Sequence, residues 1–151
     1  MNQMSLFDGA EKLRITKPIR LIELFAGYGS QALALKYLGV PFEHHRISEW
    51  AIKSIQAYKD MHFPNDDTDY SNGMDRKVIE YFLYGKVSSD YNAPTAKEQL
   101  ARMPEGALRR IYNNMKSTNN LGSILSVRGG DLGITETNKY TYILTYSFPC
   151  Q

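Results

Sequence analysis

An apolar run that ends in two closely spaced glycines constrains the fold of this chain more than any other feature. Residues 19–25 are apolar except for Arg20 and Glu23, and the sequence Ala-Gly-Tyr-Gly-Ser follows at residues 26–30. A run of this kind is typical of a strand that is buried on both faces of a parallel sheet. Glycine permits a sharp turn and lets a ligand approach the bare backbone. We therefore predict a buried strand, a tight turn and then a helix.

The residues that follow the glycines alternate between helical and strand patterns. Ser30 is the expected cap of the first helix, and Gly39 is its expected end. Residues 42–48 are predicted to form a second strand, and residues 51–61 show the spacing of a second helix. This alternation indicates an α/β fold with a mostly parallel sheet.

Two parts of the chain depart from this alternation. Residues 1–18 sustain no period and are predicted to be a flexible N-terminal tail. Residues 62–130 contain helical patterns near 75–84 and 105–115, separated by turn-forming residues, and are interpreted as a largely helical insertion. Residues 140–146 are rich in β-branched and aromatic side chains and are predicted to form a further strand.

Composition excludes several classes of protein. The chain has 151 residues, a net charge of +2 and one cysteine, which suits a single domain without internal disulfides. The net charge is too small to imply nucleic-acid binding by itself, because a strong electrostatic footprint needs clustered positive charge. No apolar run approaches the ~18 residues of a membrane-spanning helix, and no signal peptide is evident, so the cytoplasm is the expected location. His44 and His45 should face opposite ways in a strand, and no metal-ligand spacing is present.

The turn Gly27-Tyr28-Gly29 is a candidate anion site. The N–H groups and the positive end of the helix dipole favour a phosphate or a carboxylate there. Residues 27–32 also satisfy the G-x-G-x-x-A pattern of dinucleotide-binding proteins. The alternative is a tight turn that needs glycine only for its conformation.

Glu49 and Trp50 follow the second predicted strand and support a nucleoside site. Glu49 lies about 20 residues after the glycines, where an acidic side chain accepts hydrogen bonds from ribose hydroxyls. Trp50 is the only tryptophan, and its ring is large enough to cover an adenine face. The alternative is a glutamate favoured by a helix dipole and a tryptophan in the core.

Asp131 and Cys150 are two further candidate functional residues. Asp131 lies in a turn at residues 130–133, expected at the end of a third strand, where its carboxylate would accept from the amino group of adenine. Cys150 follows Pro149 after the last predicted strand, at the sheet edge where ligands bind. A thiolate of lowered pKa is a strong nucleophile. The alternatives are a common Gly-Asp turn and a cysteine without a role.

Four segments together resemble the DNA cytosine-5 methyltransferases. Residues 23–30 (Glu-Leu-Phe-Ala-Gly-Tyr-Gly-Ser) resemble the first motif of that family, and residues 48–50 (Ser-Glu-Trp) resemble the second. Residues 130–132 (Gly-Asp-Leu) resemble the third motif, and residues 147–151 (Ser-Phe-Pro-Cys-Gln) resemble the fourth. The segments occur in the family order, and Phe-Pro-Cys-Gln is the most specific of them.

The resemblance covers residues 19–61 and 130–151 and implies both a fold and a cofactor. The fold would be an incomplete Rossmann-like fold of the S-adenosylmethionine-dependent methyltransferases, with residues 19–151 as the N-terminal part of the catalytic domain. The insertion resembles the variant of phage and bacterial members that belong to restriction-modification systems. Glu49 would hold the ribose of S-adenosylmethionine, and Trp50 would pack on its adenine. The other cofactor contacts would be Phe25, Ala26, Gly27, Tyr28, Gly29, Ser30, Asp131 and Leu132.

The resemblance also implies a covalent mechanism at Cys150. The target cytosine would be flipped out of double-stranded DNA, because a thiol cannot reach it in the stack. Cys150 would attack carbon 6, which makes carbon 5 a nucleophile that takes the methyl group, and loss of the carbon 5 proton would release the thiolate. Phe148, Pro149 and Gln151 would line the substrate pocket.

The later motifs and the target-recognition domain of the family have no counterpart in these 151 residues. We therefore expect this chain to be the cofactor-binding and nucleophile-bearing N-terminal part, inactive alone. It would meet DNA through the missing C-terminal part, which would belong either to the same longer protein or to a complementing chain. One alternative is a non-catalytic remnant or complementing subunit that keeps the fold and binds a partner. Another, suggested by the G-x-G-x-x-A pattern, is a nicotinamide-dependent oxidoreductase.

Overall fold

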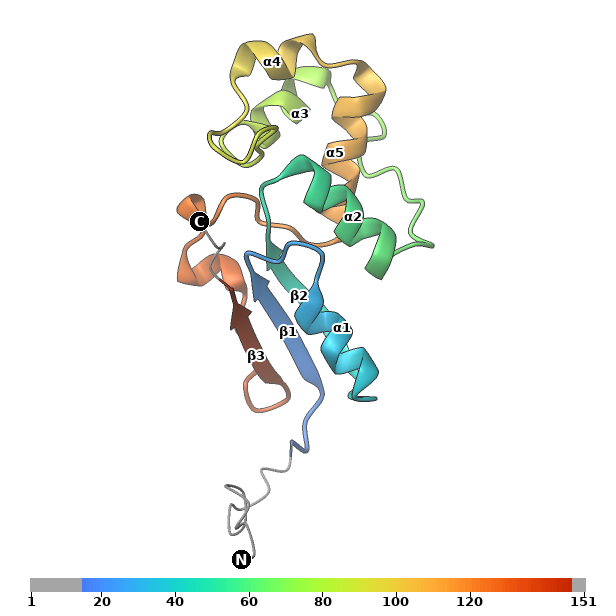
Figure 1. Ribbon diagram of the computed structural model, residues 1–151, viewed down its shortest axis with the longest axis vertical. Helices are drawn as coiled ribbons and strands as arrows, with labels where there is room; N and C mark the ends of the chain where they lie inside the picture. The colour runs from blue at the N-terminus through green and yellow to red at the C-terminus, as the bar shows by residue number, and fades with distance from the viewer. Residues whose placement is uncertain (1–14, 148–151) are drawn as a thin grey trace, which may run out of the picture.

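Three parallel strands form the sheet of the computed structural model, which describes residues 15–147 (Figure 1). They are β1 (Ile19–Leu24), β2 (Phe42–Ser48) and β3 (Thr141–Tyr146), and they lie in the order β2-β1-β3. Both neighbours pair with β1 in the parallel sense. The predicted α/β class with a mostly parallel sheet is confirmed, and the arrangement is that of a partial Rossmann-like fold. The predicted tail falls largely on residues 1–14, which lie outside the described residues.

β1 is the central strand, and its position explains its apolar sequence. Leu21 and Ile22 are 1% and 0% exposed, since both faces of the strand are covered. Glu23 is only 1% exposed although it carries a carboxyl group. A buried carboxylate is stable only with hydrogen-bond partners, so Glu23 needs donors from neighbouring elements.

Helix α1 (Ser30–Tyr37) connects β1 to β2, and its end is the predicted one. Gly39 follows it with a φ of 67°, the left-handed conformation that commonly terminates helices. The start of the helix differs from the prediction. Ser30 is the first residue of α1 and its hydroxyl bonds Gln31, while Gly29 is the N-cap with no side chain to contribute. The backbone turn itself therefore begins the helix.

Four helices gather beyond the carboxyl ends of the strands and are called the helical unit here (Figure 1). They are α2 (Ile52–His62), α3 (Arg76–Leu83), α4 (Lys97–Arg102) and α5 (Glu105–Ser117). The sequence patterns predicted α2, α3 and α5, whereas α4 has six residues and is too short to show a period. The helices share an apolar core of Ile55, Ile79, Leu83, Val87, Leu100, Leu108, Ile111, Tyr112 and Met115.

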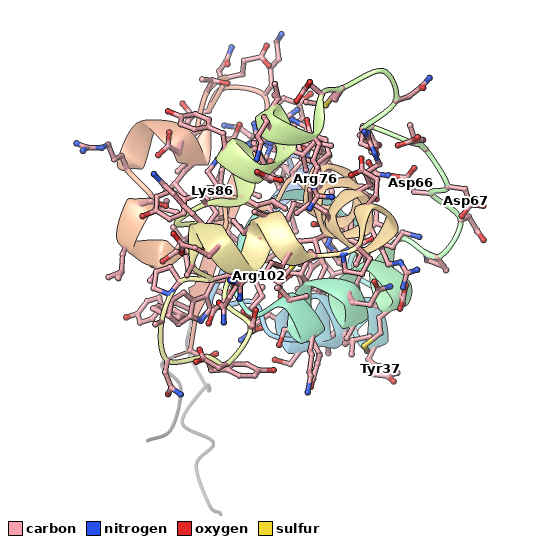
Figure 2. The ribbon with its side chains drawn as sticks, turned by 90° about the horizontal axis from the view of Figure 1, so that it is seen from above. Tyr37, Asp66, Asp67, Arg76, Lys86 and Arg102 are labelled. Atoms are coloured by element: carbon pink, nitrogen blue, oxygen red, sulfur yellow. The ribbon has the colours of Figure 1, made fainter. Side chains whose placement is uncertain are left out.

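Arg76 ties the helices of this unit together. Its guanidinium bonds Glu80 within α3 and Glu105 at the start of α5, each at 2.7 Å. Seen from above, Arg76 lies within the helical unit, whereas Asp66 and Asp67 lie on the loop at its edge (Figure 2). The guanidinium also donates to the carbonyl groups of Leu100, Ala101 and Met103.

The segment after α5 does not form the strand that was predicted ahead of Asp131. Asn120 makes a single-residue parallel bridge with Ile47 of β2, and two short 3₁₀ helices follow at Ile124–Ser126 and Gly129–Leu132. The two glycines that begin the second of these weaken any strand there. The prediction of a strand is therefore wrong at this place. Within residues 15–147, no helix is long and apolar enough to cross a membrane.

Candidate functional site

A cleft of about 400 Å³ lies where β1 and β2 end, next to the helical unit. Four of the predicted cofactor residues line it, namely Phe25, Gly27, Glu49 and Trp50. The volume is typical of small-molecule sites, and the carboxyl ends of parallel strands are where open α/β sheets bind ligands. The other lining residues are Ser48, Ser54, Tyr91, Gly122, Ser123, Ile124, Leu125 and Ser147.

The turn between β1 and α1 forms one wall of the cleft and has an unusual backbone. Phe25, Gly27 and Gly29 have φ angles of 55°, 54° and 77°. Positive φ is rare for a bulky residue such as phenylalanine. Backbone strain of this kind persists where the surroundings enforce it, and it concentrates at binding sites. The sharp turn predicted from the two glycines is confirmed.

Glu49 braces this turn from the side of the cleft. One carboxylate oxygen accepts the N–H of Gly27 at 2.8 Å, and the other accepts the N–H of Ala51 at 2.7 Å. An ionised carboxylate has about four acceptor positions, so each oxygen can accept one more hydrogen bond. Glu49 thus joins the turn to the start of α2 and retains capacity to accept from a ligand hydroxyl.

Glu23 and Tyr58 hold the same turn and α1 from the direction of α2. The Tyr58 hydroxyl donates to one carboxylate oxygen of Glu23 at 2.5 Å, and the N–H of Ala32 donates to the other at 3.1 Å. Tyr58 is 0% exposed. Burial raises the pKa of both groups, and the Glu23 charge raises the pKa of Tyr58 further. The raised pKa of Tyr58 keeps the proton on its hydroxyl, which is the donor in this bond.

His62 extends this contact to the glycines. Its Nε2–H donates to the Tyr28 carbonyl at 2.9 Å, and the Lys36 ammonium donates to Nδ1 at 3.2 Å. The ring must be neutral to accept from Lys36, and burial together with the Lys36 charge lowers the pKa of His62. A methyl group on Gly29 would press on His62 and would lie 2.7 Å from Tyr58 Cε2. Position 29 therefore requires glycine for packing as well as for φ.

His44 and His45 lie on opposite sides of β2, as predicted. Nδ1–H of His44 donates to the Tyr58 hydroxyl at 2.9 Å, whereas Nε2 of His45 lies 3.1 Å from the carbonyl oxygens of Leu132 and Gly133. Burial lowers the pKa of His44 to about 4, and nearby positive groups add to the effect. Across residues 15–147, no three His, Cys, Asp or Glu side chains gather in a way that could hold a metal ion.

Asn120, for which the sequence predicted no role, holds the segment that follows α5 beside the cleft. Its amide oxygen accepts the N–H groups of Glu49 and Gly122, at 3.1 and 2.8 Å, and its amide nitrogen donates to the Glu49 carbonyl at 2.9 Å. The Ser48 hydroxyl bonds the Gly122 carbonyl. These bonds bring Ser123, Ile124 and Leu125 to the cleft. The sequence Asn-Asn-Leu-Gly at residues 119–122 indicates a local turn of this kind, because an asparagine side chain commonly bonds the backbone two residues later.

Asp131 and Leu132 do not line the cleft. Asp131 is exposed and accepts the N–H of Arg128 at 2.8 Å, which closes a local turn. The Leu132 carbonyl faces His45 instead. The remaining predicted cofactor residues flank the lining part of the turn without forming the cleft wall: Ala26, Tyr28, Gly29 and Ser30.

The predicted nucleophile Cys150 and the predicted pocket residues Phe148, Pro149 and Gln151 lie outside the described residues. Ser147 precedes Cys150 by three residues and lines the cleft. β3 pairs with β1 in register up to Tyr146, so it ends at the same edge of the sheet as β1. Aromatic walls, a carboxylate and the turn that leads into α1 make this cleft suited to a nucleoside with a charged extension.

Comparison with known proteins supports this interpretation. No family model matches the chain. The chain is 32% identical over 138 residues to the orphan methyltransferase M.SssI of Spiroplasma monobiae, and 29% identical over 135 residues to the type II methyltransferase M2.ScrFI of Lactococcus lactis subsp. cremoris. The matches cover 90% and 88% of this chain but 35% of each relative. The chain therefore spans about a third of the length of these relatives, and the predicted resemblance to methyltransferases is confirmed.

Proposed function

We propose that this chain, a relative of the DNA methyltransferases over nine tenths of its length, binds S-adenosylmethionine in the cleft and supplies the nucleophile for methylation of cytosine at carbon 5. The observation that carries the proposal is the convergence of Gly27, Glu49 and Trp50 on one cleft that also includes Ser147. The chain would act as the cofactor-binding part of a longer or two-part enzyme, with no activity alone.

The residues of the cleft fit the chemistry of S-adenosylmethionine. The rings of Phe25 and Trp50 suit an adenine base, and aromatic faces attract a sulfonium cation. The remaining acceptor positions of Glu49 suit ribose hydroxyls. The turn before α1 suits the methionine carboxylate, because a helix start carries a partial positive charge. When bound, S-adenosylmethionine supplies an electrophilic methyl group.

Cys150 would provide the covalent step on DNA. Its thiolate adds to carbon 6 of a cytosine that has been flipped out of double-stranded DNA. The electron pair moves to carbon 5, and carbon 5 attacks the methyl group, so a carbon–carbon bond forms as the carbon–sulfur bond of the donor breaks. A base then removes the carbon 5 proton, and the thiolate leaves as the ring double bond returns.

Calorimetry tests the binding half of this proposal. Titration of the chain with S-adenosylmethionine, and with its demethylated product, should release heat. Glu49→Gln should weaken binding at least tenfold, because it removes the charge that receives the ribose and braces Gly27. Glu43→Gln, an exposed change on β2, is the matched control and should bind like the wild type. An absence of heat would favour the non-catalytic alternative, and tighter binding of NAD would favour the oxidoreductase.

A transfer assay tests the catalytic half. The chain is mixed with the part of M.SssI that it does not match, and tritium transfer from labelled S-adenosylmethionine to duplex DNA is measured. We expect labelled 5-methylcytosine with the wild-type chain and none with Cys150→Ala. Equal transfer by both would exclude Cys150 as the nucleophile.

A further inference from the structure

We propose that Tyr91, a residue of the helical insertion, forms an outer wall of the cofactor cleft and covers the nucleoside base together with Trp50. The inference rests on the proposed function and deepens it. Tyr91 lines the cleft, yet it belongs to none of the four segments that carry the family resemblance. The insertion would thereby contribute directly to recognition of the cofactor.

The loop that carries Tyr91 is fixed to the segment that carries Trp50. The N–H of Ser88 donates to the Trp50 carbonyl at 2.7 Å, and the N–H of Ile52 donates to the Ser88 carbonyl at 3.0 Å. These two bonds make a parallel bridge between Ser88 and Ala51. Ser88 is 0% exposed, so the loop begins from a buried and fully bonded position. The attachment fixes the start of the loop to the backbone beside Trp50, and both Trp50 and Tyr91 line the cleft.

The loop itself is built to hold one shape. The Ser88 hydroxyl accepts the N–H of Tyr91 at 3.0 Å and donates to the Ala93 carbonyl at 2.6 Å. The Asp90 carboxylate accepts the N–H groups of Asn92 and Ala93, at 3.0 and 3.2 Å. The side chains of Ser88 and Asp90 thus fix the backbone on both sides of Tyr91, which lines the cleft.

The conformation of Tyr91 is a second reason to assign it a role in binding. Its φ is 68°, in a region that glycine and asparagine adopt readily and tyrosine rarely does. Strain of this kind persists where the surroundings enforce it, often at ligand sites. Tyr91 is 52% exposed, so this tyrosine offers surface that a bound base would cover.

Binding of S-adenosylhomocysteine to position 91 variants tests the inference. Tyr91→Gly should weaken binding about tenfold, the usual effect of losing an aromatic wall. Tyr91→Phe should bind like the wild type, because the ring is kept. Tyr91→Asn should weaken binding as Tyr91→Gly does, because it accepts the same backbone conformation without the ring. Equal affinities of the Tyr91→Gly and Tyr91→Asn variants would show that the weaker binding comes from loss of the ring and not from a more flexible backbone.

Thermal unfolding without ligand distinguishes binding from a structural role. Tyr91→Gly relieves a positive φ, so it should leave the Tm unchanged or higher. Glu136→Gly is the matched control: Glu136 has a φ of 52° and does not line the cleft, so this variant should show the same trend in Tm and wild-type affinity. Equal affinity of Tyr91→Gly and the wild type would overturn the inference and leave the proposed function intact. Failure of the wild type to bind would overturn the proposed function itself, and the inference with it.

Discussion

Replacing Gly29 by alanine should destabilise the chain more than the same change at another left-handed glycine. Gly29 has a φ of 77°, and the new methyl group would lie 2.7 Å from Tyr58 Cε2 and press on the His62 ring. Both neighbours are buried in α2. Gly39 has a similar φ of 67°, but nothing lies within 4 Å of the position of its added methyl group. Gly39→Ala is therefore the matched control.

Two contributions add at Gly29 and only one acts at Gly39. A left-handed alanine costs about 1–2 kcal/mol, and the loss of flexibility in the unfolded chain offsets about 0.4–1 kcal/mol of this. Crowding a well-packed site costs a further 1–3 kcal/mol or so. The free energy of unfolding should thus fall by about 2–4 kcal/mol for Gly29→Ala and by about 1 kcal/mol for Gly39→Ala.

Urea unfolding followed by circular dichroism measures both losses in one experiment. The dependence on urea should stay the same in the two variants, because the surface exposed on unfolding does not change. If Gly29→Ala loses no more stability than Gly39→Ala, the close packing of the turn against α2 is refuted.

Three further changes probe other parts of the fold. The pKa of His44 is about 4 in the folded chain and about 6.5 in the unfolded chain. The free energy of unfolding should therefore fall by up to about 3 kcal/mol as the pH drops from 6.5 to 4. Urea unfolding measured across this pH range should show a smaller decrease for His44→Asn than for the wild type. Asn120→Ala should cost about 2–3 kcal/mol in the same assay, because it leaves the backbone of Glu49 without two partners. Arg76→Lys should lower the Tm more than Arg110→Lys, since a lysine cannot reproduce the forked bonds to three helices; equal shifts would count against that role.

The parts of the fold that follow from local pattern could be predicted from the sequence. The sequence of β1 is apolar because the strand is central and buried. Gly29 and Gly39 mark the two ends of α1 because both positions have a positive φ. Glu49 and Trp50 reach the cleft because they directly follow β2, whose end lies beside that of β1.

The parts that depend on distant contacts could not be predicted. The local bond of Asn120 to Gly122 could be expected from the sequence, but its bonds to Glu49, 71 residues earlier, could not. Tyr91 reaches the cleft only because Ser88 pairs with the backbone beside Trp50. Asp131 matched a motif in its residue types, but its carboxylate closes its own turn and does not reach the cleft.

Glu49 also links two regions that would otherwise open separately. The amide hydrogens of Gly27 and Ala51 belong to different connections of the fold, yet both are held by one side chain. Rotation of that side chain would expose the pair at once, so the two protons should exchange with deuterated water in a single cooperative opening. We therefore expect the turn at Gly27 and the start of α2 at Ala51 to be thermodynamically coupled, so that a ligand bound at the turn also slows amide exchange at Ala51.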